Sequence, residues 1–576
     1  MKRTLWLAFF AVLLVALIGR ALLLASGTVS FHSDEAIVGL MARHILQGER
    51  PTFFYGQAYM GSLDSWLIAL GFTVLGDSVL TMRIVESILY LLIVASGFAV
   101  AWRISERVIV AVVAALMLAI PNVLLAVYST ATLGGYNETL LFGNLILLLA
   151  WDVTHEQRRS LWRWAALGLC IGVGWWTNGL VIAFVMPAAV LILWDLWRNV
   201  RVHRRAPLQA TGDADRAGLR PAPTNAYDAV GAGFKPALTN PNDGVPIAMY
   251  VLFFALILIF FVMGSAPWWS FNLQNDWAAL RFYLPALPSH TVNTFAGTDI
   301  APLPTDQRLI GLFLLGLPAV IGLRFPWMPG FFLPIIGLLV LLIYAFAFYN
   351  LLRGRCALKP PGRLLLISMV LLFCGLFIVS RFSIDPTGRY FLPLTLPLGI
   401  VLGTLIDSLR RVILKIALVV IVIGYQFVGL VTAVATVPPG LTTQFNLETH
   451  IPNTDDQALI AFLDTHQLYH GYTNYWVSFR LAFLSADRMQ YSAVLPYKTD
   501  LSYTPFDNRY PPYIAATDHA PDDQIAYITA NVVAVRQKLE AIFAQRGVTY
   551  QESDVGVYHV YYDFQPRVPR PPLVFK

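Results

Sequence analysis

Long apolar runs, separated by short polar segments, fill the first three quarters of the chain. Runs of about twenty apolar residues match the roughly 30 Å hydrocarbon core of a bilayer, so each predicts a membrane-spanning helix. The pattern predicts a polytopic α-helical membrane protein with about eleven spans. They lie near residues 5–25, 81–101, 108–122, 138–151, 164–179, 181–197, 247–265, 331–351, 364–380, 391–407 and 412–432.

Basic segments indicate how these spans are oriented. With eleven spans they all fall on one side, which the positive-inside rule assigns to the cytoplasm together with the N-terminus. The apolar run 309–323 would break this alternation if it crossed fully, so we expect a re-entrant or interfacial helix there. Thirteen spans are the alternative. The basic segments are Arg103 with Arg107, and residues 155–163, 198–205, 353–363 and 408–415.

The remaining polar sequence divides into loops, one insertion and a tail. Helical apolar spacing at 454–467 and 531–547, and strand-like alternation at 555–564, predict a small extracytoplasmic α/β domain over 433–576. Residues 1–432 then form the membrane domain, with a first outer loop at 26–80. Within it, segment 198–246 is rich in Pro, Ala and Gly and repeats "AGLRPAPTN" as "AGFKPALTN", which predicts a disordered cytoplasmic insertion.

Composition agrees with this picture. The chain is 57% hydrophobic and only 13% charged, whereas soluble domains average about 25% charged residues. The net charge of +6 is explained by cytoplasmic loops, so no nucleic-acid partner is expected. Two of the three cysteines lie in apolar runs and one in a basic loop, which argues against a disulfide framework or a cysteine metal site.

Two acids stand directly after the first span, in "SFHSDEAIVG" (30–39). Charges near a bilayer are costly, so Asp34 and Glu35 indicate either a water-facing surface or a functional site. The segment 34–51 that they open predicts a short amphipathic helix on the outer surface, stopped by Gly48 and Pro51.

These features resemble the GT-C glycosyltransferases, in particular the bacterial branch similar to protein O-mannosyltransferases and aminoarabinose transferases. The likeness rests on the Asp-Glu opening of the first outer loop, "YGQAYMGSLDSWL" (55–67) and an arginine opening the second span, and more weakly on "GGYNETL" (134–140) and "DPTGRYFLPL" (385–394). It implies a bacterial inner-membrane enzyme that moves a sugar from a polyprenyl-phosphate donor on the outer face. The acceptor is left open among protein, lipid and glycan.

The resemblance also implies roles for individual residues. Asp34 is the expected general base of an inverting transfer, in a cleft where desolvation would raise its pKa, and Glu35 would orient it or the acceptor. Guanidinium groups suit a leaving phosphate, because their planar fork binds two oxygens at once. No metal-ligand cluster is apparent and no cofactor is expected, although a divalent metal is compatible. The donor-phosphate candidates are Arg83, Arg389 and Tyr390, and the cleft candidates are Tyr55, Gln57, Asp64 and Glu138.

Each candidate also has a structural explanation. Acids in a first helical turn are favoured by ~0.3–1 kcal/mol through the helix dipole, and arginines at span ends often reach lipid headgroups. Other function classes with similar topology are a lipid-linked sugar transporter or flippase, a glycan polymerase or ligase, and a non-catalytic scaffold.

Overall fold

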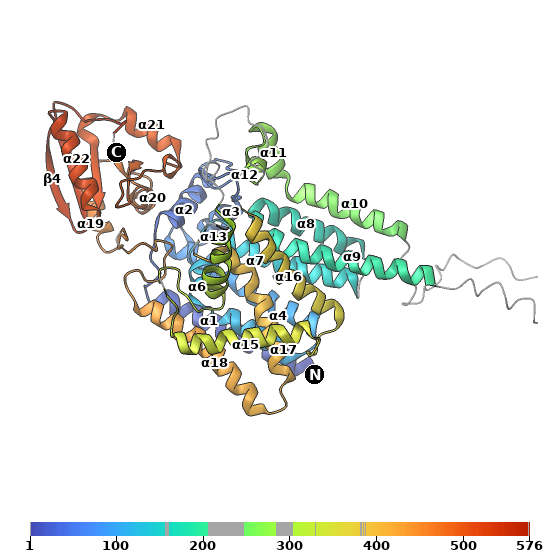
Figure 1. The fold of residues 1–576 in the computed structure, drawn as a ribbon. Helices are drawn as coiled ribbons and strands as arrows, with labels where there is room; N and C mark the ends of the chain where they lie inside the picture. Colours follow the sequence, from blue (N-terminus) through green and yellow to red (C-terminus); the bar gives the residue numbers. More distant parts are fainter. Residues whose placement is uncertain are drawn as a thin grey trace, which may run out of the picture.

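The computed structural model describes residues 2–155, 160–205, 247–283, 303–328, 330–380 and 387–573 except Glu448, together with residues 383, 385 and 575. A helical bundle forms the larger part, and an α/β domain built from the end of the chain sits at one end of it (Figure 1).

The apolar runs are helical, as predicted. Within the described ranges, seven helices are long and apolar enough to cross a membrane, or up to nine if each bent pair counts as one span. The chain is therefore a multi-pass membrane protein, while the counts of eleven or thirteen spans are not confirmed. The helices that match the predicted spans are α1 (Lys2–Ala25), α4 (Val79–Ser105), α5 (Val108–Ala119), α7 (Tyr136–Thr154), α8 (Leu161–Thr177), α9 (Ile182–Arg205), α10 (Ile247–Gly264), α15 (Pro334–Leu352), α16 (Pro360–Val379), α17 (Thr395–Ser408) and α18 (Val412–Ala435).

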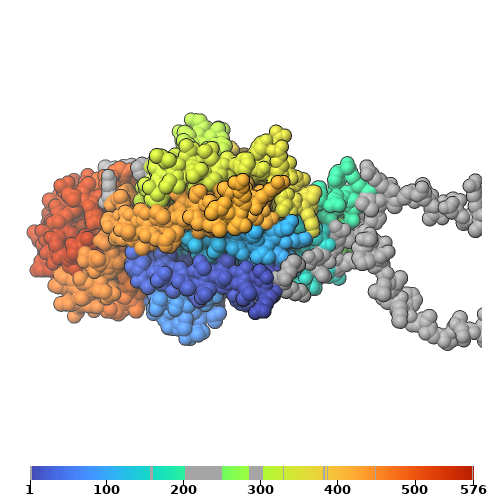
Figure 2. Space-filling model, turned by 90° about the horizontal axis from the view of Figure 1, so that it is seen from below, coloured from blue at the N-terminus to red at the C-terminus, as the bar shows by residue number. Residues whose placement is uncertain are grey.

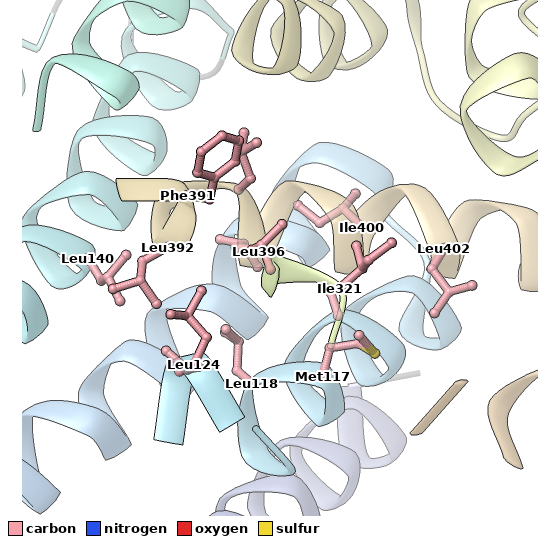
Figure 3. Close-up of a cluster of buried hydrophobic side chains, with 14 of the residues drawn as sticks. Met117, Leu118, Leu124, Leu140, Ile321, Phe391, Leu392, Leu396, Ile400 and Leu402 are labelled. Atoms are coloured by element: carbon pink, nitrogen blue, oxygen red, sulfur yellow. The ribbon is translucent and has the colours of Figure 1, made fainter. Parts of the chain in front are cut away.

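The core of the bundle lies around α17 and the short 3₁₀ helix η4 (Arg389–Leu394) that precedes it (Figure 3). Two glycines one turn apart bring α17 close to α5. A Cβ on Gly399 would lie 3.1 Å from Cα of Ala114, and one on Gly403 would lie 3.0 Å from Cα of Val110. Small residues at such contacts maximise van der Waals packing between membrane helices.

The outer helices have the opposite character. Figure 2 shows α1 (dark blue), α18 (orange) and α15 (yellow) on one face. These helices expose large apolar side chains such as Phe10, Ile335 and Val420, at 60%, 88% and 62% exposure. Such a surface suits lipid contact and would be unusual in water.

One span is broken at a polar residue. α5 is followed by α6 (Val123–Thr130) at an angle of 68°. Asn122 caps α6 by accepting a hydrogen bond from the Leu125 amide at 2.9 Å, and its own amide donates to the Val320 carbonyl at 2.6 Å. These two hydrogen bonds fix the start of α6 at the bend.

The segment predicted as re-entrant or interfacial is a short helical stretch. It consists of α13 (Thr305–Ile310), a π-helical turn at Gly311–Gly316 and α14 (Leu317–Val320). Gly316 packs so closely on η4 that a Cβ there would lie 2.0 Å from the Phe391 ring. Its placement relative to a membrane stays a prediction.

The helix predicted on the outer surface at 34–51 is instead buried along most of its length. α2 (Ser33–Leu46) buries eleven of its residues, because α20 (Tyr475–Leu484) of the C-terminal domain covers it. A Cβ on Gly39 would lie 2.5 Å from the Phe483 ring, so glycine permits this close contact. The next helix of the loop, α3 (Leu63–Leu75), packs between α2 and α4.

The C-terminal domain is α/β, as predicted. Its five strands lie in the order β2-β1-β3-β5-β4, with β1 parallel to β2 and β3, and β5 antiparallel to β3 and β4. The strand predicted at 555–564 is confirmed as β5 (Tyr558–Gln565), and a turn at Gly556, where φ is +59°, joins it to β4. The elements are α19 (Asp456–Thr465), β1 (His470–Asn474), α20, β2 (Gln490–Leu495), α21 (Pro511–His519), β3 (Ile525–Ala530), α22 (Val533–Gln545), β4 (Thr549–Val555) and β5 (Tyr558–Gln565).

The predicted disordered insertion at 198–246 begins inside a helix, because residues 198–205 continue α9. The rest of that prediction, residues 206–246, lies outside the described residues.

Candidate active site

A cavity of about 160 Å³ lies where the membrane domain, the first loop and the C-terminal domain meet. Asp34 at the first turn of α2 opens onto it, and two arginines from distant parts of the chain share the same wall. The lining residues are Asp34, Phe54, Gln57, Tyr59, Met60, Tyr128, Leu133, Tyr136, Arg389, Thr443 and Arg509.

Asp34 is held by two hydroxyl groups from the later part of the chain. The Tyr475 hydroxyl donates a short hydrogen bond to Oδ1, and the Thr443 hydroxyl donates to Oδ2 at 2.8 Å. His32 Nδ1 lies 4.0 Å from Oδ2, and the Asp34 side chain is 28% exposed. The carboxylate is therefore fixed in orientation while one side still faces the cavity.

These neighbours decide the protonation state of Asp34. Desolvation by itself would raise its pKa, but the nearby His32 and Arg509 charges and the Tyr475 and Thr443 hydrogen bonds outweigh it, so that the pKa lies below the usual 3.8. The predicted upward shift is thus wrong in direction. A depressed pKa means that ionised Asp34 adds stability above pH 3.8, and that this is lost as pH falls through the folded-state pKa.

Arg389 reaches the cavity from the start of η4. Asp385 forms an ion pair with its guanidinium, and the Asp385 carboxylate also accepts hydrogen bonds from the Thr387 amide and hydroxyl at 2.8 and 2.6 Å. Gly388, with φ +87°, turns the chain between them. Asp385, Thr387 and Gly388 therefore build a compact turn that presents Arg389, whose side chain is 35% exposed.

Arg509 reaches the same cavity from the C-terminal domain. Its guanidinium lies 4.9 Å from the Tyr475 ring centroid and 5.5 Å from that of Phe54. With the Gln57 amide turned so that its oxygen faces the arginine, Oε1 accepts hydrogen bonds from both terminal nitrogens at 2.8 and 3.3 Å. Among the described residues no carboxylate lies within ion-pair distance of Arg509, so its charge remains available to an anion in the cavity.

Three of the predicted site residues meet here: Asp34, Gln57 and Arg389. Tyr390 does not line the cavity. Its hydroxyl accepts a hydrogen bond from the neighbouring Arg389 at 3.3 Å. Tyr55 lies elsewhere, donating to Glu49 at 2.6 Å and stacking on Tyr510.

Glu35 and Arg83 pair with each other outside the cavity. Nε of Arg83 donates to Oε1 of Glu35 at 3.2 Å, and a terminal nitrogen donates to Oε2 at 3.0 Å. The Glu35 side chain is fully buried and that of Arg83 is 11% exposed. This two-pronged pair joins α2 to the start of α4. The structure thus places Arg83 against a protein carboxylate, away from the cavity that holds Asp34.

The last two candidates, Asp64 and Glu138, lie in a separate buried cluster with Glu86. Sequence reasoning missed three polar residues that the C-terminal part of the chain brings to the site, Thr443, Tyr475 and Arg509. It also missed the tyrosines in the cavity lining, Tyr59, Tyr128 and Tyr136. Tyr475 belongs to "HGYTNYWVSFRLAF" (470–483), whose aromatic content is a visible signal, whereas "DNRYPP" (507–512) around Arg509 carries none.

Comparison with known proteins places this geometry in context. A family profile described as dolichyl-phosphate-mannose-protein mannosyltransferase matches residues 62–211. The structure of ArnT from Cupriavidus metallidurans bound to undecaprenyl phosphate aligns over 98% of both chains at 13% identity, with a TM-score of 0.54. The apo state of that protein aligns over 97% of this chain and 98% of its own, at 13% identity and a TM-score of 0.55. The chain has the GT-C fold.

This confirms the fold resemblance drawn from the sequence; identity this low shows the fold alone. The Archaeoglobus fulgidus oligosaccharyltransferase in complex with Zn and sulfate is more distant, at 12% identity over 96% of this chain and 73% of that one, with a TM-score of 0.45. A search of curated protein sequences gives no significant match. The family profile begins at residue 62, after Asp34. The match therefore assigns no role to Asp34.

Proposed function

We propose that this GT-C protein is a glycosyltransferase that moves a sugar from a polyprenyl-phosphate donor to an acceptor hydroxyl on the outer face of a bacterial inner membrane. The observation that carries the proposal is the shared wall of the cavity, where one carboxylate, Asp34, and two guanidinium groups, Arg389 and Arg509, converge. A carboxylate suits proton removal and a pair of arginines suits a phosphate. The undecaprenyl phosphate bound to the structurally similar ArnT supports a lipid-linked donor.

The proposed reaction is a single inverting displacement. Asp34 takes the proton of the acceptor hydroxyl while its oxygen forms a bond to the anomeric carbon. The bond from that carbon to the phosphate oxygen breaks, and the electron pair leaves with the lipid phosphate. Arg389 and Arg509 offset the negative charge that grows on this phosphate. Tyr475 and Thr443 keep the Asp34 carboxylate ionised and correctly turned.

An apolar groove gives the hydrocarbon chain a place to lie. It has a volume of about 420 Å³ and runs between α1, the end of α5 and α18. Arg20 in its wall donates to Ser129 at 2.8 Å and also to Thr130. The adjacent Tyr128 lines the cavity, so the last residues of α6 contact both Arg20 of the groove and the cavity. In the proposed complex the lipid chain lies in this groove and its phosphate reaches Arg389 and Arg509.

The assay that tests the proposal uses purified protein in lipid with a panel of radiolabelled polyprenyl-phosphate sugars and membrane extract as acceptor source. Release of free polyprenyl phosphate that depends on the protein is the expected result. Tight donor binding without any release would contradict the proposal and favour the transporter or flippase class.

Arg509→Gln tests the contribution of the C-terminal domain to donor binding. A charge-assisted hydrogen bond contributes about 1.5–3 kcal/mol, so donor affinity should fall roughly tenfold to a hundredfold. Titration of donor into the variant measures this, with Arg488→Gln as control because Arg488 pairs with Asp464 elsewhere in the same domain. Equal donor affinity in both variants would remove Arg509 from the phosphate site.

Tyr475→Phe tests how Asp34 is kept ionised. Loss of the phenol hydrogen bond should raise the Asp34 pKa, because that bond favours the charged form. The acidic limb of kcat/KM should therefore move to higher pH, by about one unit at most. Tyr503→Phe is the matched control, since its hydroxyl donates to the Ala493 carbonyl outside the cavity. An unmoved acidic limb would show that Tyr475 does not set this ionisation.

A further inference from the structure

Three carboxylates meet in the interior of the protein, beside the proposed active site but outside its cavity. Asp64 comes from α3, Glu86 from α4 and Glu138 from α7, and each residue is at most 2% exposed. One oxygen from each lies within 4.8 Å of the others. None of the three lines the cavity that contains Asp34, and the proposed reaction does not use them.

Two of the carboxylates have protein donors that fix them. Asp64 accepts hydrogen bonds from the Thr132 hydroxyl at 2.6 Å and from the Gly134 and Gly135 amides at 2.9 and 3.3 Å. Both glycines have positive φ, +83° and +87°, which lets successive amides point at one acid. Glu86 accepts a short hydrogen bond from the Asn137 amide.

Glu138 has no such partner. Both of its carboxylate oxygens are buried without a hydrogen bond, although the residue is only 1% exposed. Across the described part of the chain, no arginine, lysine or histidine forms an ion pair with any of the three acids. Like charges this close disfavour one another's ionisation, and a buried unpaired charge is strongly destabilising. Arg20 acts on Glu86 through its charge but forms no ion pair with it, so no described side chain supplies the cluster with a directly bound cation.

The donor atoms indicate which cation would bind here. One oxygen from each acid lies within 4.8 Å of the others, close enough for the three carboxylates to bind one ion. An all-oxygen donor set also selects hard cations over Zn²⁺ or Cu²⁺.

We propose that Asp64, Glu86 and Glu138 form a binding site for one hard divalent cation. Glu138 supplies the otherwise unused carboxylate, and the ion ties α3 of the first loop to α4 and α7. The role is structural, because the site holds the base of the loop that carries Asp34. The sequence alone indicated no metal cluster, since its three ligands are widely separated along the chain.

The test uses full-length protein purified in detergent, dialysed against EDTA, and then titrated separately with CaCl₂, MnCl₂ and MgCl₂. We expect about one divalent ion bound per chain, by elemental analysis and, for Mn²⁺, by spectroscopy, with a rise in the thermal unfolding midpoint. In Glu138→Gln, which keeps the side-chain shape, affinity should fall at least about tenfold. Asp195→Asn is the control, as Asp195 is a buried acid hydrogen-bonded to Tyr250 elsewhere.

Two results would overturn the proposal. Wild-type protein that binds none of the three ions, and whose unfolding midpoint they do not move, would show that the acids are neutralised by protons. Equal ion binding by wild type and Glu138→Gln would place the ion elsewhere. If Glu138→Gln does not fold, Asp64→Asn takes its place. The metal content of the wild type alone still decides whether the acids bind an ion or are neutralised by protons.

Discussion

Replacing Asp34 with asparagine is expected to remove nearly all glycosyl transfer while leaving a folded protein that still binds its donor. Asparagine has almost the same shape, but its amide cannot take a proton from the acceptor hydroxyl. Loss of a positioned general base costs typically 10²–10⁴-fold in rate. Because both arginines of the cavity remain, donor affinity should change little.

The measurement compares polyprenyl phosphate release by wild type and variant at saturating donor, and donor binding by direct titration. Asp77→Asn is the matched control, since it removes an acid that pairs with Arg43 outside the cavity. Turnover by Asp34→Asn at the wild-type rate would eliminate Asp34 as the base while leaving the enzyme class intact.

Arg83→Met is expected to destabilise the protein strongly. It leaves the fully buried Glu35 carboxylate without the cation that binds it at 3.0 Å. Breaking a buried ion pair from one side costs about 3–5 kcal/mol, because the remaining charge is uncompensated. The unfolding midpoint in denaturant or heat should therefore fall well below that of wild type.

The double variant Glu35→Met with Arg83→Met separates this structural role from phosphate binding. Replacing both partners by apolar side chains removes the uncompensated charge, so most of the stability should return. If Arg83→Met is as stable as wild type but loses donor affinity, then Arg83 serves the lipid phosphate, as its position at a span end suggested.

The helices were predictable from sequence because a span is a local feature. An apolar run such as 412–432 carries its own signal, and α18 is found there. The number of membrane crossings is harder to predict from the sequence. α7 contains Asn144 and Asp152, whose polar side chains pair with neighbouring helices that the sequence of α7 does not reveal.

The site was only partly predictable for the same reason. Asp34 and Arg389 stand in recognisable local patterns, so the family resemblance could point to them. Arg509 enters the cavity only because α20 docks on α2, a contact between segments more than 400 residues apart. Glu86 did carry a signal that was not used, since an acid inside an apolar span is usually functional.

The origin of the cavity wall has a consequence for how the protein is made. Arg509 lies 475 residues after Asp34 in the chain, so it is synthesised much later. At about 5–20 residues per second, the ribosome needs roughly 25 to 95 seconds to pass from one to the other. During that interval the first loop is already translated but lacks Thr443, Tyr475 and Arg509. The nascent chain therefore has no complete cavity, and any activity that depends on it begins only after the last domain has folded onto the first loop.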